Sequence, residues 1–86
     1  MTEKEFLKLV GRNLARYRKD RGMTQRELAG KARLKLSTIA SIECGQSGTT
    51  LKTLKRIADV LNISPILLFS NSDYICISKS ELKNII

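Results

Sequence analysis

The chain has 86 residues, which is enough for one compact domain but leaves no room for an additional ligand-sensing domain of ordinary size. Apolar residues make up 42% and charged residues 28%, a balance that favours a globular protein over a disordered one. Sixteen Lys and Arg against eight Asp and Glu give a net charge of +8. This excess favours a polyanionic partner such as DNA or RNA, although a membrane surface would also attract it.

Several classes of protein are disfavoured by the residues present. Cys44 and Cys76 are the only cysteines and there is no histidine, so we expect no zinc site, no other metal site and no cofactor. No acid pair, glycine-rich phosphate loop or nucleophile with a nearby base suits catalysis, and we expect no enzyme. The longest uncharged apolar-rich stretch, residues 60–72, is too short and polar to span a bilayer, and no signal-peptide core follows Met1. We therefore expect a cytoplasmic protein with reduced thiols.

The first predicted helix covers residues 3–20. Its apolar residues recur at helical spacing: Phe6, Val10, Leu14 and Tyr17. Thr2 and Glu5 have the form of a capping box at its start, and Gly22 is well placed to end it in a left-handed conformation.

Two short helices follow, and only three residues join them. The second helix opens at Thr24 and ends near Ala32 or Arg33. The third covers Leu36–Cys44, and Gly45 marks its end. Helices joined by so tight a turn must cross steeply, which is the geometry of a helix-turn-helix.

The rest of the chain predicts two more helices and a tail. Thr50 can cap a fourth helix, whose predicted buried face is Leu51, Leu54, Ile57, Ala58 and Leu61. Proline suits the first position of a helix, so Pro65 predicts the start of a fifth. Residues 74–78 alternate as in a short strand, and a final turn of helix follows. We expect an all-α, five-helix domain over residues 1–70 and a strand and helix tail over residues 71–86.

From Gly11 to Phe69 the sequence resembles the lambda-repressor/Cro-type helix-turn-helix family, also called the XRE family. The matching residues are Gly11, Leu14, Arg18, Gly22, Met23-Thr24-Gln25, Glu27-Leu28-Ala29, Ser37-Thr38-Ile39, Ile42-Glu43, Gly45, Leu51, Leu54, Ile57-Ala58 and Leu61. The resemblance implies a lambda-repressor-like fold and a homodimer that binds double-stranded DNA with sequence specificity and regulates transcription, for example as a repressor. It further implies a recognition helix, Leu36–Cys44, that enters the major groove.

The outer side of that helix suits contact with base edges. It presents Leu36, Ser37, Thr38 and Ser41, opposite the inward Ile39 and Ile42. In similar proteins the positions of Leu36, Ser37 and Ser41 read bases. Leu36 stands where many relatives have a long polar residue, so we expect it to contact a thymine methyl group. Lys35 replaces the usual Ser or Thr cap and adds a cation that can reach a base or a phosphate.

Further contacts are expected around this helix. Gln25 begins the second helix, where backbone N–H groups attract phosphate, and the family uses this glutamine to bond the DNA backbone. Arg26, Gln46 and Thr49 are candidates for the same phosphates, although each alone also fits a solvated residue.

Two further sets of charged residues involve the first helix, and neither is expected to contact bases. Arg18 and Glu43 match a pair that in similar proteins forms an ion pair between the first and third helices, which positions the recognition helix without touching bases. A basic stripe along the first helix is either a solvated face or a source of non-specific DNA attraction. It consists of Lys8, Arg12, Arg16 and Lys19.

The carboxyl end is the expected dimer surface. Its apolar residues are too many to leave exposed on a small monomer, and we single out Ile66, Phe69, Tyr74, Ile75 and Ile77. Two-fold pairing of strands 74–78 would set two recognition helices about 34 Å apart, which predicts a pseudo-palindromic operator. The alternative is a tail that folds back onto its own core.

Two other functions remain open from the sequence. The first is a protein-interaction module, such as an antitoxin or adaptor with a protein partner and secondary DNA binding. The second, RNA binding, is less favoured because aromatic residues are few. A sequence-specific DNA binder differs from both because it combines a steep loss of affinity with salt and a strong sequence preference.

Overall fold

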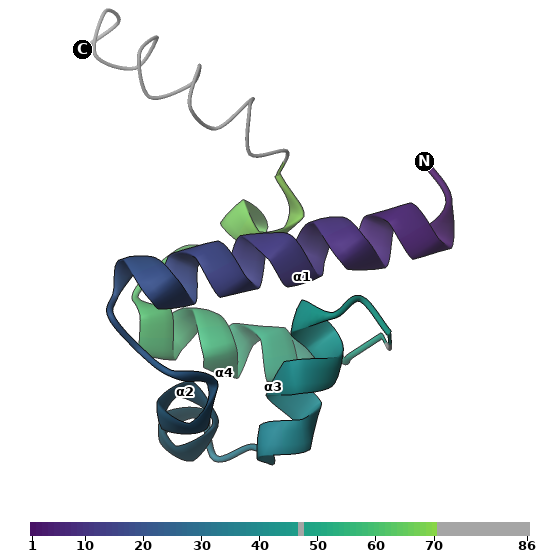
Figure 1. Cartoon of the computed structure of the whole chain (residues 1–86). Helices are drawn as coiled ribbons and strands as arrows, with labels where there is room; N and C mark the ends of the chain where they lie inside the picture. The colour runs from purple at the N-terminus through teal and green to yellow at the C-terminus, as the bar shows by residue number, and fades with distance from the viewer. Residues whose placement is uncertain (47, 71–86) are drawn as a thin grey trace, which may run out of the picture.

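A computed structural model describes residues 1–46 and 48–70 of the chain (Figure 1). It contains four α-helices and one 3-10 helix: α1 (Glu3–Asp20), α2 (Gln25–Ala32), α3 (Leu36–Glu43), α4 (Leu51–Leu61) and η1 (Pro65–Phe69). The long α1 packs against α3 and η1, while α2 packs against α3 and α4. Within residues 1–46 and 48–70 all assigned elements are helices, so the all-α prediction is confirmed for this part of the chain.

Side-chain caps fix the start of the first two helices as the sequence predicts. The hydroxyl of Thr2 accepts the N–H of Glu5 at 3.1 Å, and the Glu5 carboxylate accepts the N–H of Thr2 at 3.4 Å. Thr24 and Glu27 make the same reciprocal pair at 3.0 Å in both directions. These bonds satisfy N–H groups that have no partner inside the helix. Lys35, the residue before α3, makes no side-chain cap.

All four α-helices end in the same hydrogen-bond motif. One or two positions after the last helical residue, the backbone adopts a left-handed conformation. The N–H of the residue that follows this left-handed residue then donates to the carbonyl five positions before it, at 2.9–3.1 Å. The left-handed residues are Gly22, Arg33, Gly45 and Asn62, with φ between 57° and 69°. The predicted stops at Gly22 and Gly45 are therefore confirmed. α3 ends at Glu43, one residue before the predicted end, and Cys44 is its cap.

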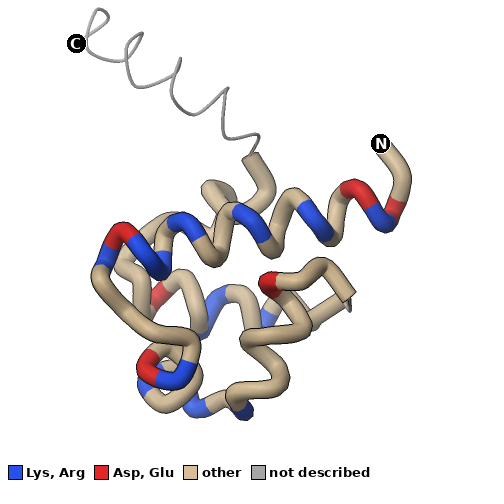
Figure 2. Tube along the Cα trace, viewed as in Figure 1, with Lys and Arg blue, Asp and Glu red and all other residues tan. Residues whose placement is uncertain are grey.

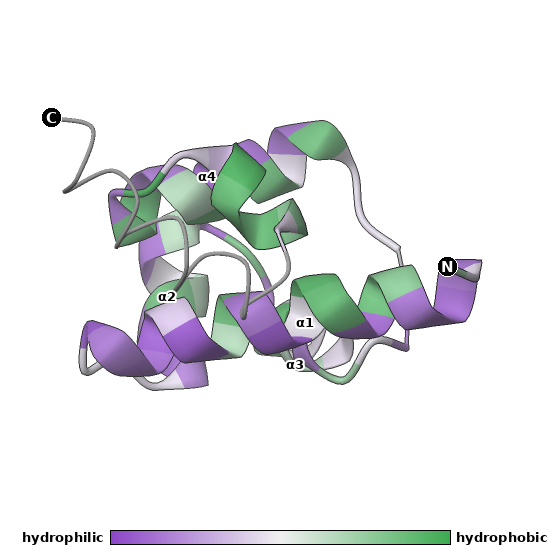
Figure 3. Cartoon of the chain, turned by 90° about the horizontal axis from the view of Figure 1, so that it is seen from above, coloured by the Kyte–Doolittle hydropathy of each residue, from purple (hydrophilic) through white to green (hydrophobic). Residues whose placement is uncertain are grey.

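One continuous core lies between the helices. Figure 3 shows hydrophobic and hydrophilic segments alternating along α1, which is buried on one side only. The largest fully buried apolar side chains of this core are Leu14, Leu28, Ile39, Ile57, Leu61 and Leu68. The predicted burial of Leu51 is wrong, since 77% of this side chain is exposed. Leu51 is the first residue of α4, and burial of that helix begins one turn later at Leu54.

The expectation of a fifth α-helix is not confirmed, because Pro65–Phe69 forms a 3-10 helix. Ser70 is extended (φ −90°, ψ 143°) and ends the segment after five residues. The buried Asn13 amide of α1 donates to the carbonyls of Leu68 at 2.9 Å and Ser70 at 2.6 Å, which satisfies acceptors left free at this terminus. The predicted strand and the rest of the tail, residues 71–86, lie outside the described residues.

Candidate nucleic-acid interface

The inner side of α3 is anchored in the core. Ile39 and Ile42 are 0% and 3% exposed. Gly11 of α1 lies directly against the last turn of α3, where a Cβ at Gly11 would collide with the carbonyl oxygen of Ile42 and lie 2.7 Å from that of Glu43. The two helices can approach this closely only because Gly11 has no side chain. α3 is therefore fixed in position along one side.

The outer side of α3 is open. Leu36 is 38% exposed, Ser37 is exposed, and Thr38 and Ser41 are half-buried. Leu36 and Ser37 are the more exposed of these four residues, and both lie in the first turn of the helix. A helix that is anchored on one side and carries short side chains on the other can approach the floor of a DNA groove.

A bidentate ion pair joins α1 to α3. The guanidinium of Arg18 donates from Nε to Glu43 Oε2 at 2.7 Å and from Nη2 to Oε1 at 3.0 Å. Their side chains are only 10% and 6% exposed. The hydrogen bond to Glu43 raises the pKa of Arg18 above its ordinary value, against the opposing effect of burial. The third nitrogen, Nη1, donates to the carbonyl of Met23 at 2.7 Å, so Arg18 also holds the segment that leads into α2.

Gln25 extends this ion pair to a third helix. Its amide nitrogen donates to Glu43 Oε1 at 3.0 Å, so the Glu43 carboxylate joins α1, α2 and α3. The amide nitrogen carries two hydrogens, and within residues 1–46 and 48–70 the second makes no hydrogen bond to another side chain or carbonyl. This bond was not predicted from the sequence, because Gln25 and Glu43 are 18 positions apart and no periodic pattern links them.

The remaining predicted contact residues lie at both ends of α3. Gln25 and Arg26 begin α2 beside the carboxyl end of α3, and Gln46 follows that end. Lys35 is exposed at the opposite, amino end. Thr49 is half-buried and borders a small apolar pocket of about 150 Å³ between α1, α4 and η1, so its side chain is less free than expected.

Basic residues recur along α1 and around α2 (Figure 2). On the stripe along α1, Lys8, Arg12 and Lys19 are exposed. Arg16 is half-buried, with its guanidinium carbon 5.2 Å from the centre of the Tyr17 ring. Such a contact with an aromatic face is attractive for a cation and leaves Arg16 less available to a partner.

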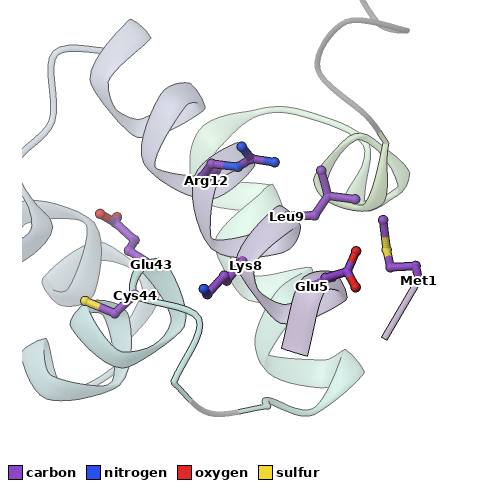
Figure 4. A pocket seen from close by; sticks show the side chains of 7 residues that line it. All are labelled: Met1, Glu5, Lys8, Leu9, Arg12, Glu43 and Cys44. Atoms are coloured by element: carbon purple, nitrogen blue, oxygen red, sulfur yellow. The ribbon is translucent and has the colours of Figure 1, made fainter. Parts of the chain in front are cut away.

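A hollow of about 350 Å³ lies beside the start of α1 and the end of α3 (Figure 4). Its lining residues are Met1, Glu5, Lys8, Leu9, Arg12, Glu43 and Cys44. Among residues 1–46 and 48–70, no group of three or more His, Cys, Asp or Glu side chains is arranged to hold a metal ion. The helices in these ranges also include none with the length and apolar character to cross a membrane.

The residues predicted for the dimer surface differ in exposure. Ile66 is 70% exposed on η1. Phe69 is half-buried and stacks on Phe6 of the same chain, with ring centres 5.8 Å apart and planes 4° from parallel. The other three predicted residues, Tyr74, Ile75 and Ile77, lie outside the described residues.

Comparison with known proteins agrees with this geometry. The sequence model of the helix-turn-helix family matches residues 14–68. The chain is 35% identical over 69 residues to the uncharacterised HTH-type transcriptional regulator y4dJ of Sinorhizobium fredii, covering 80% of this chain and 90% of that protein. It is 32% identical over 66 residues to the HTH-type transcriptional regulator SinR of Bacillus licheniformis, covering 76% of this chain but only 60% of SinR.

A solved structure extends the comparison to three dimensions. The restriction-modification controller protein C.AhdI of Aeromonas hydrophila superposes with a TM-score of 0.72 at 32% identity, covering 73% of this chain and 96% of that protein. Sequence and fold thus agree over the segment that contains α2, the turn and α3. The chain belongs to the XRE-type helix-turn-helix family of DNA-binding transcription regulators.

Proposed function

We propose that the chain binds double-stranded DNA with sequence specificity as a homodimer, with the predicted recognition helix Leu36–Cys44 in the major groove. One observation carries this proposal: α3 is anchored along its inner side and open along its outer side. Gly11 and Arg18 fix the inner side, while Leu36 and Ser37 are exposed. An anchored helix presents its outer side chains with little loss of entropy on binding, which favours specific contact.

The readout by this surface is mainly apolar and short-range. Leu36 makes no hydrogen bond to a base edge, but its exposed side chain suits the methyl group of thymine. Ser37, Thr38 and Ser41 add short hydroxyl groups that donate to or accept from either kind of base pair. With few long polar side chains on α3, sequence-dependent DNA shape also contributes to the preference.

Phosphate contacts would hold the helix in register. Gln25 suits this role because Glu43 fixes its amide while leaving one amide hydrogen free. Arg26 lies beside it at the amino end of α2, where N–H groups and the helix dipole attract anions. Lys35 and Gln46, at opposite ends of α3, would reach phosphates on the two edges of the groove. Thr49 is the weakest candidate because it is half-buried.

Selection of bound sequences from a random duplex pool, followed by footprinting, tests the proposal. We expect a pseudo-palindromic sequence, bound with an affinity that falls steeply as salt rises and with a preference of several kcal/mol over unrelated DNA. The variant Leu36→Ala should lower the affinity or change the preferred base beside it. If no sequence is enriched, or if Leu36→Ala alters neither affinity nor preference, the proposal is wrong.

The homodimer would form through η1 and the tail that follows it. Residues 1–70 would then be the DNA-binding domain and residues 71–86 the dimerisation element. Support comes from the 70% exposure of Ile66, which is large for an isoleucine on a small domain. Sedimentation of the variants Ile66→Asp and Ile75→Asp tests this arrangement, and at least one should shift the chain to monomer. Dimers that persist in both variants would place the interface elsewhere.

The biological setting is proposed from the relatives. C.AhdI is a restriction-modification controller, and this chain spans nearly all of its length. A controller of this kind, acting on DNA in the cytoplasm, fits a regulator whose response is set by its own concentration and dimerisation. Binding of the selected sequence next to a promoter, with reduced or increased transcription in a purified system, would distinguish repression from activation.

A further inference from the structure

The residue that ends α2 differs from those that end the other three α-helices. All four helices finish in the same hydrogen-bond motif around a left-handed residue. Three of these residues are Gly22, Gly45 and Asn62, the types that tolerate a positive φ best. The fourth is Arg33, with φ 59° and ψ 46°. Because a Cβ in this conformation crowds the backbone carbonyl, arginine is an unfavourable choice there.

Contacts within the described part of the chain do not offset this penalty. The N–H of Arg33 bonds the carbonyl of Gly30 at 3.3 Å, a bond that any residue other than proline would make. The side chain is exposed. Across residues 1–46 and 48–70, the two ion pairs are Arg18–Glu43 and Lys55–Asp59, so the guanidinium of Arg33 has no carboxylate partner there.

The position of Arg33 suggests what its side chain binds. It lies in the turn immediately before α3, between Lys31 and Lys35, all three of them exposed. Residues 28–42 contain these three cations and no acidic residue. The turn between α2 and α3 is therefore a concentrated positive surface at the amino end of the proposed recognition helix (Figure 2).

We propose that Arg33 binds a DNA phosphate beside the amino end of α3. This inference rests on the proposed function, because the first turn of a recognition helix is the part that reaches the bases. Phosphates at the edge of the groove then lie beside the turn that precedes it. A guanidinium matches phosphate oxygens with two parallel N–H donors, and a long side chain is needed to reach them from the turn. The contact adds affinity for any sequence and increases the dependence on salt.

The variants Arg33→Gly and Arg33→Lys test this role on the duplex that the full chain selects. Arg33→Gly removes both the backbone penalty and the charge, so Tm should rise by several degrees while DNA affinity falls. We expect binding about fivefold weaker at 0.15 M salt, and a plot of log affinity against log salt less steep by about 0.9. Arg33→Lys should keep the slope, because it keeps the charge.

Two control variants separate the causes. Asn62→Gly changes the equivalent left-handed residue of α4 and should leave the slope unchanged. Arg56→Gln removes one charge from the exposed face of α4 and should change the slope less than Arg33→Gly does.

Three outcomes count against one or the other proposal. If the chain enriches no sequence, the proposed function fails. If it enriches a sequence that Arg33→Gly binds with the same slope, only the role of Arg33 is wrong, and an acidic protein surface becomes the better partner for this turn. A Tm that falls in Arg33→Gly would remove the premise that arginine is unfavourable in the turn and would also overturn the inference.

Discussion

Gly11 of α1 and Ile42 of α3 touch through their backbones: there is no space at the α-carbon of Gly11 for even one methyl group, because the carbonyl oxygen of Ile42 occupies it. The neighbour is backbone at the end of a buried helix, so it cannot rotate away as a flexible side chain would. The spacing between α1 and the proposed recognition helix is therefore set by the absence of a side chain.

The variant Gly11→Ala should destabilise the fold strongly. We expect a loss of about 3 kcal/mol, since α3 must move away from α1 to admit the methyl group. Thermal unfolding without DNA measures it. Gly30→Ala is the matched control, because Gly30 is also helical but has open space around its α-carbon. That change should stabilise the chain by about 0.5–1 kcal/mol, and equal effects of the two variants would contradict the close contact.

Removal of the Glu43 carboxylate should be equally damaging. Glu43→Ala leaves Arg18 charged and nearly buried without a carboxylate partner, and releases the amide of Gln25. A cost of about 3–5 kcal/mol follows from the lost compensation of a buried charge. Asp59→Ala removes an exposed ion pair with Lys55 and should change stability by less than about 0.5 kcal/mol. A Tm for Glu43→Ala within a degree of the starting chain would refute the structural role of the pair.

The buried amide of Asn13 gives a prediction for the end of η1. Asn13→Leu leaves the carbonyls of Leu68 and Ser70 without this donor and should cost about 1–3 kcal/mol. Asn13→Asp has the same shape, but its ionised carboxylate faces these oxygens. Its destabilisation should be larger at pH 7 than at pH 4, where the protonated acid can donate. A pH-independent difference between the Asp and Leu variants would argue against the hydrogen bonds.

The start of α2 should weaken in acid. Hydrogen bonds from the backbone and side chain of Thr24 lower the pKa of Glu27 below its ordinary value of 4.5. A carboxyl whose pKa is depressed by folding stabilises the fold above its unfolded pKa, and this contribution is lost as pH falls through the folded pKa. The Tm difference between the starting chain and Glu27→Gln should therefore be largest near neutral pH and shrink below about pH 4.5. A constant difference from pH 7 to pH 3 would contradict this.

Local features of the fold could be predicted from the sequence, whereas contacts between distant residues could not. The capping box of Thr24 and the stop at Gly22 depend on residues within a few positions, so their types suffice to predict them. The bonds of Asn13 to residues 68 and 70 join groups more than fifty positions apart, and they lie at the end of the segment that was predicted to be a fifth α-helix.

The candidate site divides in the same way. The exposure of Leu36 and Ser37 follows from the helical period and the inward Ile39 and Ile42. The bond from Gln25 to Glu43, by contrast, needs the crossing of α2 and α3 in three dimensions. The type of residue at position 33 was visible in the sequence, but its positive φ depends on where α2 ends.

Gly11 and Asn13 are two residues apart on α1, yet one contacts α3 and the other holds the backbone around Ser70. A single rigid helix therefore joins the surface proposed to read DNA to the point where the described chain ends. If two copies associate through their carboxyl ends, the rigid helix fixes the distance between their two recognition surfaces. A small change in how the carboxyl ends meet would then change the operator spacing that the pair can span.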